Sequence, residues 1–96
     1  MNITDYIPYG HEHAVTRKQL RRMTGKGDRA VREMIFAARR ETPILNLQDG
    51  KGYFIPTEEE CMLVTRYIAQ ETKRLKSIGW ALKSAKRYMR GREDAQ

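Results

Sequence analysis

Hydrophobic residues first recur at helical spacing in the segment VTRKQLRRMTG. The segment opens with a capping box, in which Thr16 is the N-cap and Gln19 stands three residues later. Leu20 and Met23 are the expected inward-facing residues, and Gly25 suits the left-handed end of a helix. The pattern predicts a short helix that begins at Thr16 and ends at Gly25.

A second helical stripe follows in DRAVREMIFAARRE. Asp28 is the expected N-cap, because its carboxylate can accept backbone N–H groups and suits the positive end of the helix dipole. The residues predicted to face inward are Val31, Met34, Ile35 and Ala38. The face left outside carries Arg29, Arg32, Glu33, Phe36 and Arg40.

Apolar and polar residues then alternate on either side of Asp49-Gly50, a pair typical of a two-residue type I′ hairpin turn. The expected register pairs Leu45 with Phe54, Asn46 with Tyr53, Leu47 with Gly52, and Gln48 with Lys51. Alternation places Leu45, Leu47 and Phe54 on the core face. The opposite face receives Asn46, Gln48, Lys51 and Tyr53.

One long helix is predicted for residues 57–92. Thr57 and Glu60 form a second capping box directly after Pro56, and no proline follows. A seam of nine positions, spaced alternately by three and four residues, has eight apolar members. The seam consists of Cys61, Val64, Ile68, Glu71, Leu75, Ile78, Leu82, Ala85 and Met89. An unbroken helix of this length spans about 50 Å, and residues 93–96 are expected to fray.

The distal half of this seam needs a partner, because the seam is longer than a small domain can cover. Val64, Ile68, Leu75, Ile78, Leu82 and Met89 are the expected dimerisation residues. Gly79 is the weak point of the helix, since glycine costs roughly 1 kcal/mol relative to alanine in a helix interior. The pattern therefore allows two outcomes, a homodimer or a helix that bends at Gly79 and folds back.

Opposite the seam lies a line of bases, here named the basic strip. It contains one aromatic residue and consists of Arg66, Lys73, Trp80 and Arg87, with Lys76, Lys83 and Arg90 beside them. Glu71 is the single acid between Cys61 and Arg92, where nine bases occur. Such a strip is either a solvated helix face or a second nucleic-acid site. Trp80 is expected to be buried against the domain or a second chain, or else exposed for a protein partner.

Composition narrows the function classes. The chain has 96 residues, a formal charge of +7 and a pI of about 9.9, which suits one domain with a polyanionic partner. Cys61 is the single cysteine, so neither an intramolecular disulfide nor a cysteine-based zinc site can form, which fits a reducing cytosol. The N-terminal segment does not read as a signal peptide, and no apolar run is long enough to span a membrane. We expect a cytoplasmic protein without membrane contact.

Candidate catalytic and metal motifs are weak. His11-Glu12-His13 stands on an irregular segment and lacks a further ligand, so no metal site is expected. The sequences GKG and DGKG are too short for a phosphate-binding P-loop. No set of nucleophile, base and acid is visible. The sequence favours a protein that is not an enzyme and has no cofactor and no small-molecule substrate.

Two short helices joined by a glycine turn form a helix-turn-helix, and a hairpin directly after them makes the unit winged. The motifs TRKQL..MTG..DRAVRE and TPILNLQDGKGYFIPT resemble the winged-helix domains of small phage and prophage proteins. The resemblance covers residues 10–57 and extends loosely into RYIAQETKRLKSIGWALKSAKRYM. It implies DNA binding in phage gene control or replication. The chain departs from the family at Phe36 and Ala37, where polar residues are usual, so this face either reads DNA alone or also binds protein.

The expected architecture is mainly α with a short β-hairpin. It comprises a winged helix-turn-helix over residues 1–56, a long helix over residues 57–92 and a frayed tail over residues 93–96. Arg29 and Arg32 are the expected readers of base edges, since arginine is the commonest bidentate partner of guanine. Glu33 either accepts from a cytosine amine or pairs along the helix. The expected contacts to the DNA backbone are Thr16, Arg17, Lys18, Arg21, Arg22, Lys26, Lys51 and Tyr53.

The predicted function is binding of double-stranded DNA as a homodimer, in a transcriptional regulator or a replication accessory protein. The alternative is a phage-borne protein that binds and inhibits a host protein or a ribonucleoprotein defence complex. Exposure of Phe36 and Trp80 favours that alternative. RNA binding is a third, weaker reading.

Overall fold

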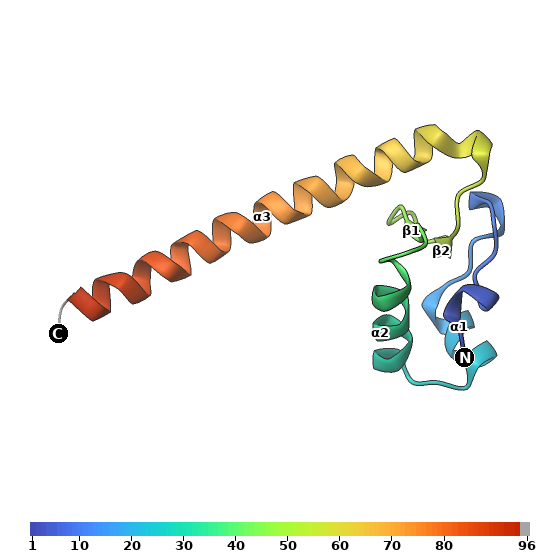
Figure 1. Cartoon of the computed structure of the whole chain (residues 1–96), viewed down its shortest axis with the longest axis horizontal. Helices are drawn as coiled ribbons and strands as arrows, with labels where there is room; N and C mark the ends of the chain where they lie inside the picture. Colours follow the sequence, from blue (N-terminus) through green and yellow to red (C-terminus); the bar gives the residue numbers. More distant parts are fainter. Residues whose placement is uncertain (95–96) are drawn as a thin grey trace.

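The computed structural model describes residues 1–94 of the chain. The protein is mainly helical, with a two-stranded antiparallel hairpin and a long C-terminal helix (Figure 1). In chain order the elements are the 3₁₀ turns η1 (Ile3–Tyr6) and η2 (His11–His13), the helices α1 (Arg17–Thr24) and α2 (Asp28–Ala38), the strands β1 (Leu45–Asn46) and β2 (Tyr53–Phe54), the 3₁₀ turn η3 (Glu58–Glu60), and the helix α3 (Cys61–Asp94).

Helix α1 has the predicted ends but a different buried side. The capping box is confirmed, because the Gln19 N–H donates to Thr16 Oγ1 at 3.1 Å and the Thr16 N–H donates to Gln19 Oε1 at 2.7 Å. The prediction that Met23 faces inward is wrong, since 46% of its surface is exposed. Thr24 takes that place and donates its hydroxyl to the carbonyl of Leu20 at 2.7 Å. A threonine can be buried here because its only donor is satisfied within the helix.

Helix α2 begins one residue earlier than a cap at Asp28 requires. Gly27 is the N-cap and makes no side-chain bond, so the prediction for Asp28 is wrong. Asp28 is the first helical residue, and its carboxylate is held by the side chains of Arg17 and Arg32 rather than by backbone N–H groups. The inward stripe is confirmed, with Val31 and Ile35 buried and its other two members half-buried.

The hairpin has the predicted register and a different turn. Leu45 pairs with Phe54 and Asn46 with Tyr53, but the ladder stops there, so the pairings expected beyond it, Leu47 with Gly52 and Gln48 with Lys51, are wrong. A type I′ turn needs a positive φ at both central residues. In the loop Gly50 has a φ of 84°, whereas the positive φ of a non-glycine residue falls on Gln48 (59°) and not on Asp49. The Asp49 carboxylate instead accepts the Lys51 N–H at 3.1 Å, which forms a wider loop.

The buried residues form two clusters, one on each face of the hairpin. The first joins η1, α1 and α2 to Ile44 and Ile55. The second consists of Leu45, Leu47 and Phe54, which confirms the predicted core face. Tyr53 does lie opposite Phe54, but it is half-buried against the first cluster, and its backbone pairs with that of Val15. The hairpin face predicted to receive Asn46, Gln48, Lys51 and Tyr53 therefore also carries part of the core.

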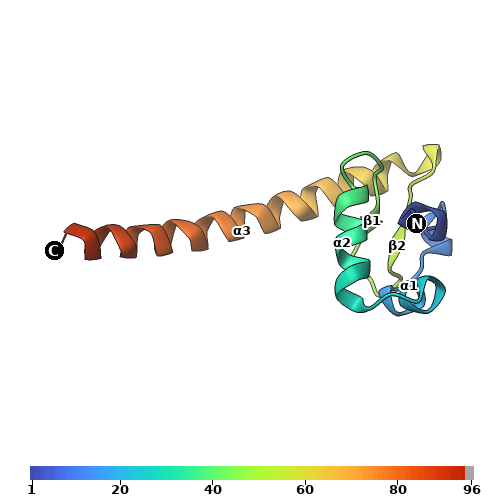
Figure 2. The same ribbon diagram turned by 60° about the horizontal axis from the view of Figure 1, so that its bottom comes forward.

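Helix α3 docks on the body through its first turns and then continues alone. The capping box at Thr57 is confirmed, although a 3₁₀ turn precedes the α-helix. Leu63, Val64 and Tyr67 pack on the second cluster, so Val64 contacts its own domain rather than being left for the predicted dimer seam. The distal part of the helix extends away from the body, as Figures 1 and 2 show. The radius of gyration is 17.6 Å, against about 13 Å for a compact chain of this length.

The helix passes through Gly79 without a break, so the fold-back at this glycine does not occur. Glu93 and Asp94, which were expected to fray, are helical, and the rest of the predicted tail, residues 95–96, lies outside the described residues. Trp80 is not buried against the domain, because 72% of its surface is exposed. Within residues 1–94, every helix is too short or too polar to cross a lipid bilayer.

Gly52→Ala should strongly destabilise the fold. Gly52 has a φ of 103°, and a Cβ there clashes with the carbonyl oxygen of Val15. The matched control is Gly50→Ala, where φ is also positive (84°) but the space is open. Backbone strain alone costs about 1 kcal/mol at Gly50, and the added clash should raise the loss at Gly52 above about 3 kcal/mol. Urea unfolding measures both, and equal losses would contradict the contact with Val15.

Candidate nucleic-acid interface

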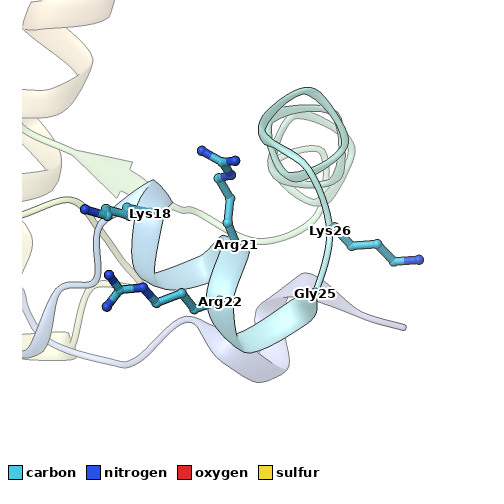
Figure 3. A pocket seen from close by; sticks show the side chains of 5 residues that line it. All are labelled: Lys18, Arg21, Arg22, Gly25 and Lys26. Atoms are coloured by element: carbon cyan, nitrogen blue, oxygen red, sulfur yellow. The ribbon is translucent and has the colours of Figure 1, made fainter.

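Four bases of α1 and the following turn gather on one side of the body. Lys18, Arg21 and Arg22 stand on α1 at steps of three and four residues, and Lys26 follows Gly25 in the turn. These residues line a shallow hollow, and their side chains spread outward rather than converging on one point (Figure 3). A spread of this kind suits a row of anionic groups better than one small ligand.

None of these four bases makes an ion pair with a described residue. Helix α1 itself contains no acid. All four side chains are exposed. Gly25, with a φ of 71°, ends the helix and turns the chain toward α2. The hollow is therefore a positively charged surface whose charge no described neighbour neutralises.

Arg29 and Arg32 of α2 are paired, in contrast to Lys18, Arg21 and Arg22 of α1. Arg29 Nε lies 3.2 Å from Glu33 Oε1, the pairing along the helix that was one of the two readings of Glu33. Arg32 Nε lies 3.4 Å from Asp28 Oδ2. The other oxygen of Asp28 lies 2.5 Å from Arg17 Nε, so one carboxylate joins the starts of α1 and α2. The hydrogen bond that Arg17 donates to the Asp28 carboxylate raises the pKa of Arg17.

A deeper hollow separates α2 from the hairpin and α3. Phe36, Glu71 and Arg74 line it from the two helices. Arg39 also lines this hollow and donates to the Ile44 carbonyl at 2.9 Å. Its guanidinium carbon lies 5.8 Å from the ring centroids of both Tyr53 and Tyr67. Sequence patterning missed Arg39, because its partners come from the hairpin and α3. Phe36 lies at the edge of this hollow with 68% of its surface exposed.

The loop of the hairpin is tied to the N-terminal segment by His11. The ring of His11 lies 2.6 Å from Asp49 Oδ2 and 5.0 Å from the ring of Phe54. Its backbone N–H donates to Glu60 Oε2 at 2.9 Å. One residue thus fixes the hairpin loop and the start of α3, and no local pattern in the sequence indicates this role.

The structure divides the residues predicted to contact the DNA backbone into separate groups. Lys18, Arg21, Arg22 and Lys26 share the hollow on α1. Thr16, Arg17 and Tyr53 line a second hollow beside the hairpin loop. Lys51 is exposed on the loop and lines neither hollow. The Thr16 N–H is already used by Gln19, so it is not free to bind phosphate.

The His11-Glu12-His13 segment does not gather ligands. The His11 ring is turned to Asp49, while His13 Nε2 lies 3.5 Å from Glu12 and is largely exposed. In the part of the chain that the structure describes, no three His, Cys, Asp or Glu side chains lie close enough together to hold a metal ion.

Comparisons of the chain with protein-family models, with curated proteins and with solved structures found no match.

The free energy of unfolding should fall as the pH drops below about 4. Burial alone raises the pKa of Asp49, but hydrogen bonds from the Lys51 N–H and the His11 ring outweigh it and hold the pKa below its usual range. The backbone N–H groups of Thr57 and His11 likewise lower the pKa of Glu60. A carboxyl group whose pKa is lowered by folding stabilises the fold at pH values above its pKa in the unfolded chain, which is near 4. This contribution is lost as the pH falls through the lower pKa of the folded state.

Urea unfolding at pH 6 and pH 3 tests this expectation. The variant Asp49→Asn with Glu60→Gln should lose less stability between the two pH values than the wild type. The control is Glu41→Gln with Glu59→Gln, exposed carboxylates whose side chains accept no hydrogen bond from the described residues. An identical pH dependence in all three proteins would contradict the assignment.

Proposed function

We propose that the protein binds duplex DNA as a winged helix-turn-helix, with α2 in the major groove, and acts as a transcriptional regulator or replication accessory protein of a phage or prophage. The observation that carries the proposal is the set of four exposed, unpaired bases on α1 and its turn, next to the exposed face of α2. Basic side chains in this position can contact the phosphates that flank a groove of DNA.

The order of elements supports the winged form. Helix α1, a turn that contains two glycines, helix α2 and the hairpin follow one another within residues 17–54. The buried faces of α1 and α2 meet in the first cluster through Leu20, Val31 and Ile35, which leaves the side of α2 with Arg29 and Arg32 in solvent. In helix-turn-helix proteins the second helix of such a pair enters the groove.

The ion pairs of α2 suit a reader that is oriented before it binds. Asp28 and Glu33 hold Arg32 and Arg29 on the exposed side of the helix. These pairs are exposed and therefore weak, so exchange for a guanine edge costs little. The two carboxylates also lower the affinity of α2 for phosphate groups. This favours contact with the nucleobases of DNA over contact with its sugar-phosphate backbone.

The free half of α3 supports a dimer formed by a second copy of the chain. Leu75, Ile78 and Leu82 are each more than half exposed, on the part of α3 that extends away from the body. An isolated helix of about 20 residues is marginal in water. A second α3 packed along the seam from Leu75 to Met89 covers these residues and presents two DNA-binding units.

Exposure of Phe36 and Trp80 favours a second candidate function, binding to a protein or ribonucleoprotein of the host. Phe36 is 68% and Trp80 72% exposed. Large exposed aromatic residues are frequent anchors of protein interfaces. The two candidates differ in a direct way, because only the main proposal predicts that the protein enriches a sequence from random duplex DNA.

Selection from random duplex DNA followed by substitution tests the main proposal. Wild-type protein should enrich a sequence, and Arg29→Ala with Arg32→Ala should lower its preference for that site over scrambled DNA. A base-edge contact provides about 1–3 kcal/mol of discrimination, or roughly 5- to 150-fold. Lys51→Ala should weaken binding to the selected site and to scrambled DNA equally, since phosphate contacts carry no sequence information. A wild type that enriches no duplex would refute the proposal.

Light scattering at tens of micromolar should give twice the chain mass of 11.3 kDa. Leu75→Asp with Leu82→Asp should give the monomer mass, because charges replace the centre of the apolar seam. The matched control is Ser77→Asp with Ser84→Asp, which adds the same charges two residues further on, about 200° around the helix. A monomeric wild type, or equal dissociation of both variants, would contradict a dimer through this seam.

A further inference from the structure

The excess positive charge of the chain lies in the distal half of α3 rather than in the body. Residues 1–72 contain eleven Lys and Arg against ten Asp and Glu, a net charge of +1. Residues 73–92 contain eight bases and no acid, a net charge of +8. These bases are Lys73, Arg74, Lys76, Lys83, Lys86, Arg87, Arg90 and Arg92. The main polyanion-binding capacity of the chain is thus on a helix that extends away from the body.

Bases in this segment are also close neighbours of one another. Lys83 and Arg87 stand four residues apart, as do Lys86 and Arg90, and like charges at this spacing destabilise a helix. The ion pair of Arg74 with Glu71, at 3.2 Å, lies at the proximal end of the segment and does not involve these four residues. This repulsion destabilises the exposed part of α3. A polyanionic partner that binds there removes the repulsion.

The basic strip faces away from the seam and from the body. Lys76, Lys83 and Arg90 stand one position after seam residues, about 100° around the helix. The other four residues stand two positions after seam residues, and two residues correspond to about 200° around an α-helix. The pairs are Val64 and Arg66, Glu71 and Lys73, Ile78 and Trp80, and Ala85 and Arg87. Because Val64 packs on the hairpin, the strip points to the opposite side. A second copy on the seam leaves the strip open.

We propose that the distal part of the basic strip, from Lys73 to Arg90, binds the phosphate backbone of duplex DNA, as a second DNA surface separate from α1 and α2. These residues span about 26 Å along a straight helix, at 1.5 Å per residue. Duplex DNA offers one negative charge per 1.7 Å of its axis, so a rigid row of bases meets several phosphates at once. The indole N–H of Trp80 is a further donor for a phosphate oxygen.

The position of Trp80 separates this partner from an anionic membrane. A basic amphipathic helix on a membrane buries its apolar face and places its aromatic residues on or beside that face. Trp80 lies within the basic strip instead, and Lys83 Nζ is 5.2 Å from the centre of its ring. Insertion of the seam therefore leaves the largest aromatic side chain in water.

The salt dependence of binding to one random-sequence duplex of about 30 base pairs tests the proposal on the full chain. The strip variant is Lys83→Gln, Arg87→Gln and Arg90→Gln. Each phosphate contact contributes about −0.9 to the slope of log K against log salt, so the strip variant should bind with a slope less steep by about 2 to 3. Its charge-retaining control, Lys83→Arg with Arg87→Lys and Arg90→Lys, should keep the wild-type slope.

The same measurement on Lys18→Gln with Arg21→Gln and Arg22→Gln separates the two surfaces. A strip variant with the wild-type slope overturns the second surface, and weaker binding by the α1 variant then leaves the proposed function intact. Loss of slope in the strip variant alone supports the strip and removes the α1 surface. Circular dichroism without DNA should show at least wild-type helix content in the strip variant, because like charges are removed. Weaker binding of that variant to phosphatidylglycerol vesicles, but not to the duplex, overturns the proposal.

Discussion

The fold depends on a hairpin with only two paired residues in each strand, because that hairpin carries apolar side chains on both faces. Ile44 and Ile55 enter the cluster that holds α1 and α2, whereas the adjacent Leu45 and Phe54 enter the cluster that holds α3. Neighbouring residues of a strand point to opposite sides, so each strand contributes to both clusters. A two-stranded hairpin is marginal alone. Here it is stable because helices cover each face, and Gly52 is required where β2 approaches Val15.

The same constraint determines where α3 points. Its first turns pack on the second cluster, and the amide of Gln70 donates to the Asn46 carbonyl at 2.9 Å. This bond fixes the helix across β1, after which α3 leaves the body on the side of α2 (Figures 1 and 2). Phe36 and Arg74 consequently line one hollow, although 38 residues separate them in the chain. Any partner of the exposed face of α2 therefore lies close to the point where α3 departs.

Local signals predicted the elements well, because their causes are local. The capping box at Thr16, the left-handed Gly25 and the pairing of Leu45 with Phe54 each depend on residues close in sequence or on strict alternation. Two of the failures have partners from elsewhere in the chain. Asp28 is not a cap because Arg17 holds it, and the hairpin turn is wider because His11, 38 residues away, binds Asp49. The candidate site was predicted as a list of bases, but not which of them are paired with acids.

That distinction changes what the net charge means. A charge of +7 suggested a basic DNA-binding domain, yet the acids of the body nearly balance its bases. Pairing is uneven, since Arg29 and Arg32 on α2 have acidic partners, whereas Lys18, Arg21 and Arg22 on α1 have none among the described residues. In the proposed complex, attraction to phosphate therefore comes from α1 and the distal half of α3. Helix α2 contributes mainly the discrimination between DNA base pairs. Long-range attraction and readout then lie on separate elements, so the affinity for DNA in general can change without altering the helix that reads sequence.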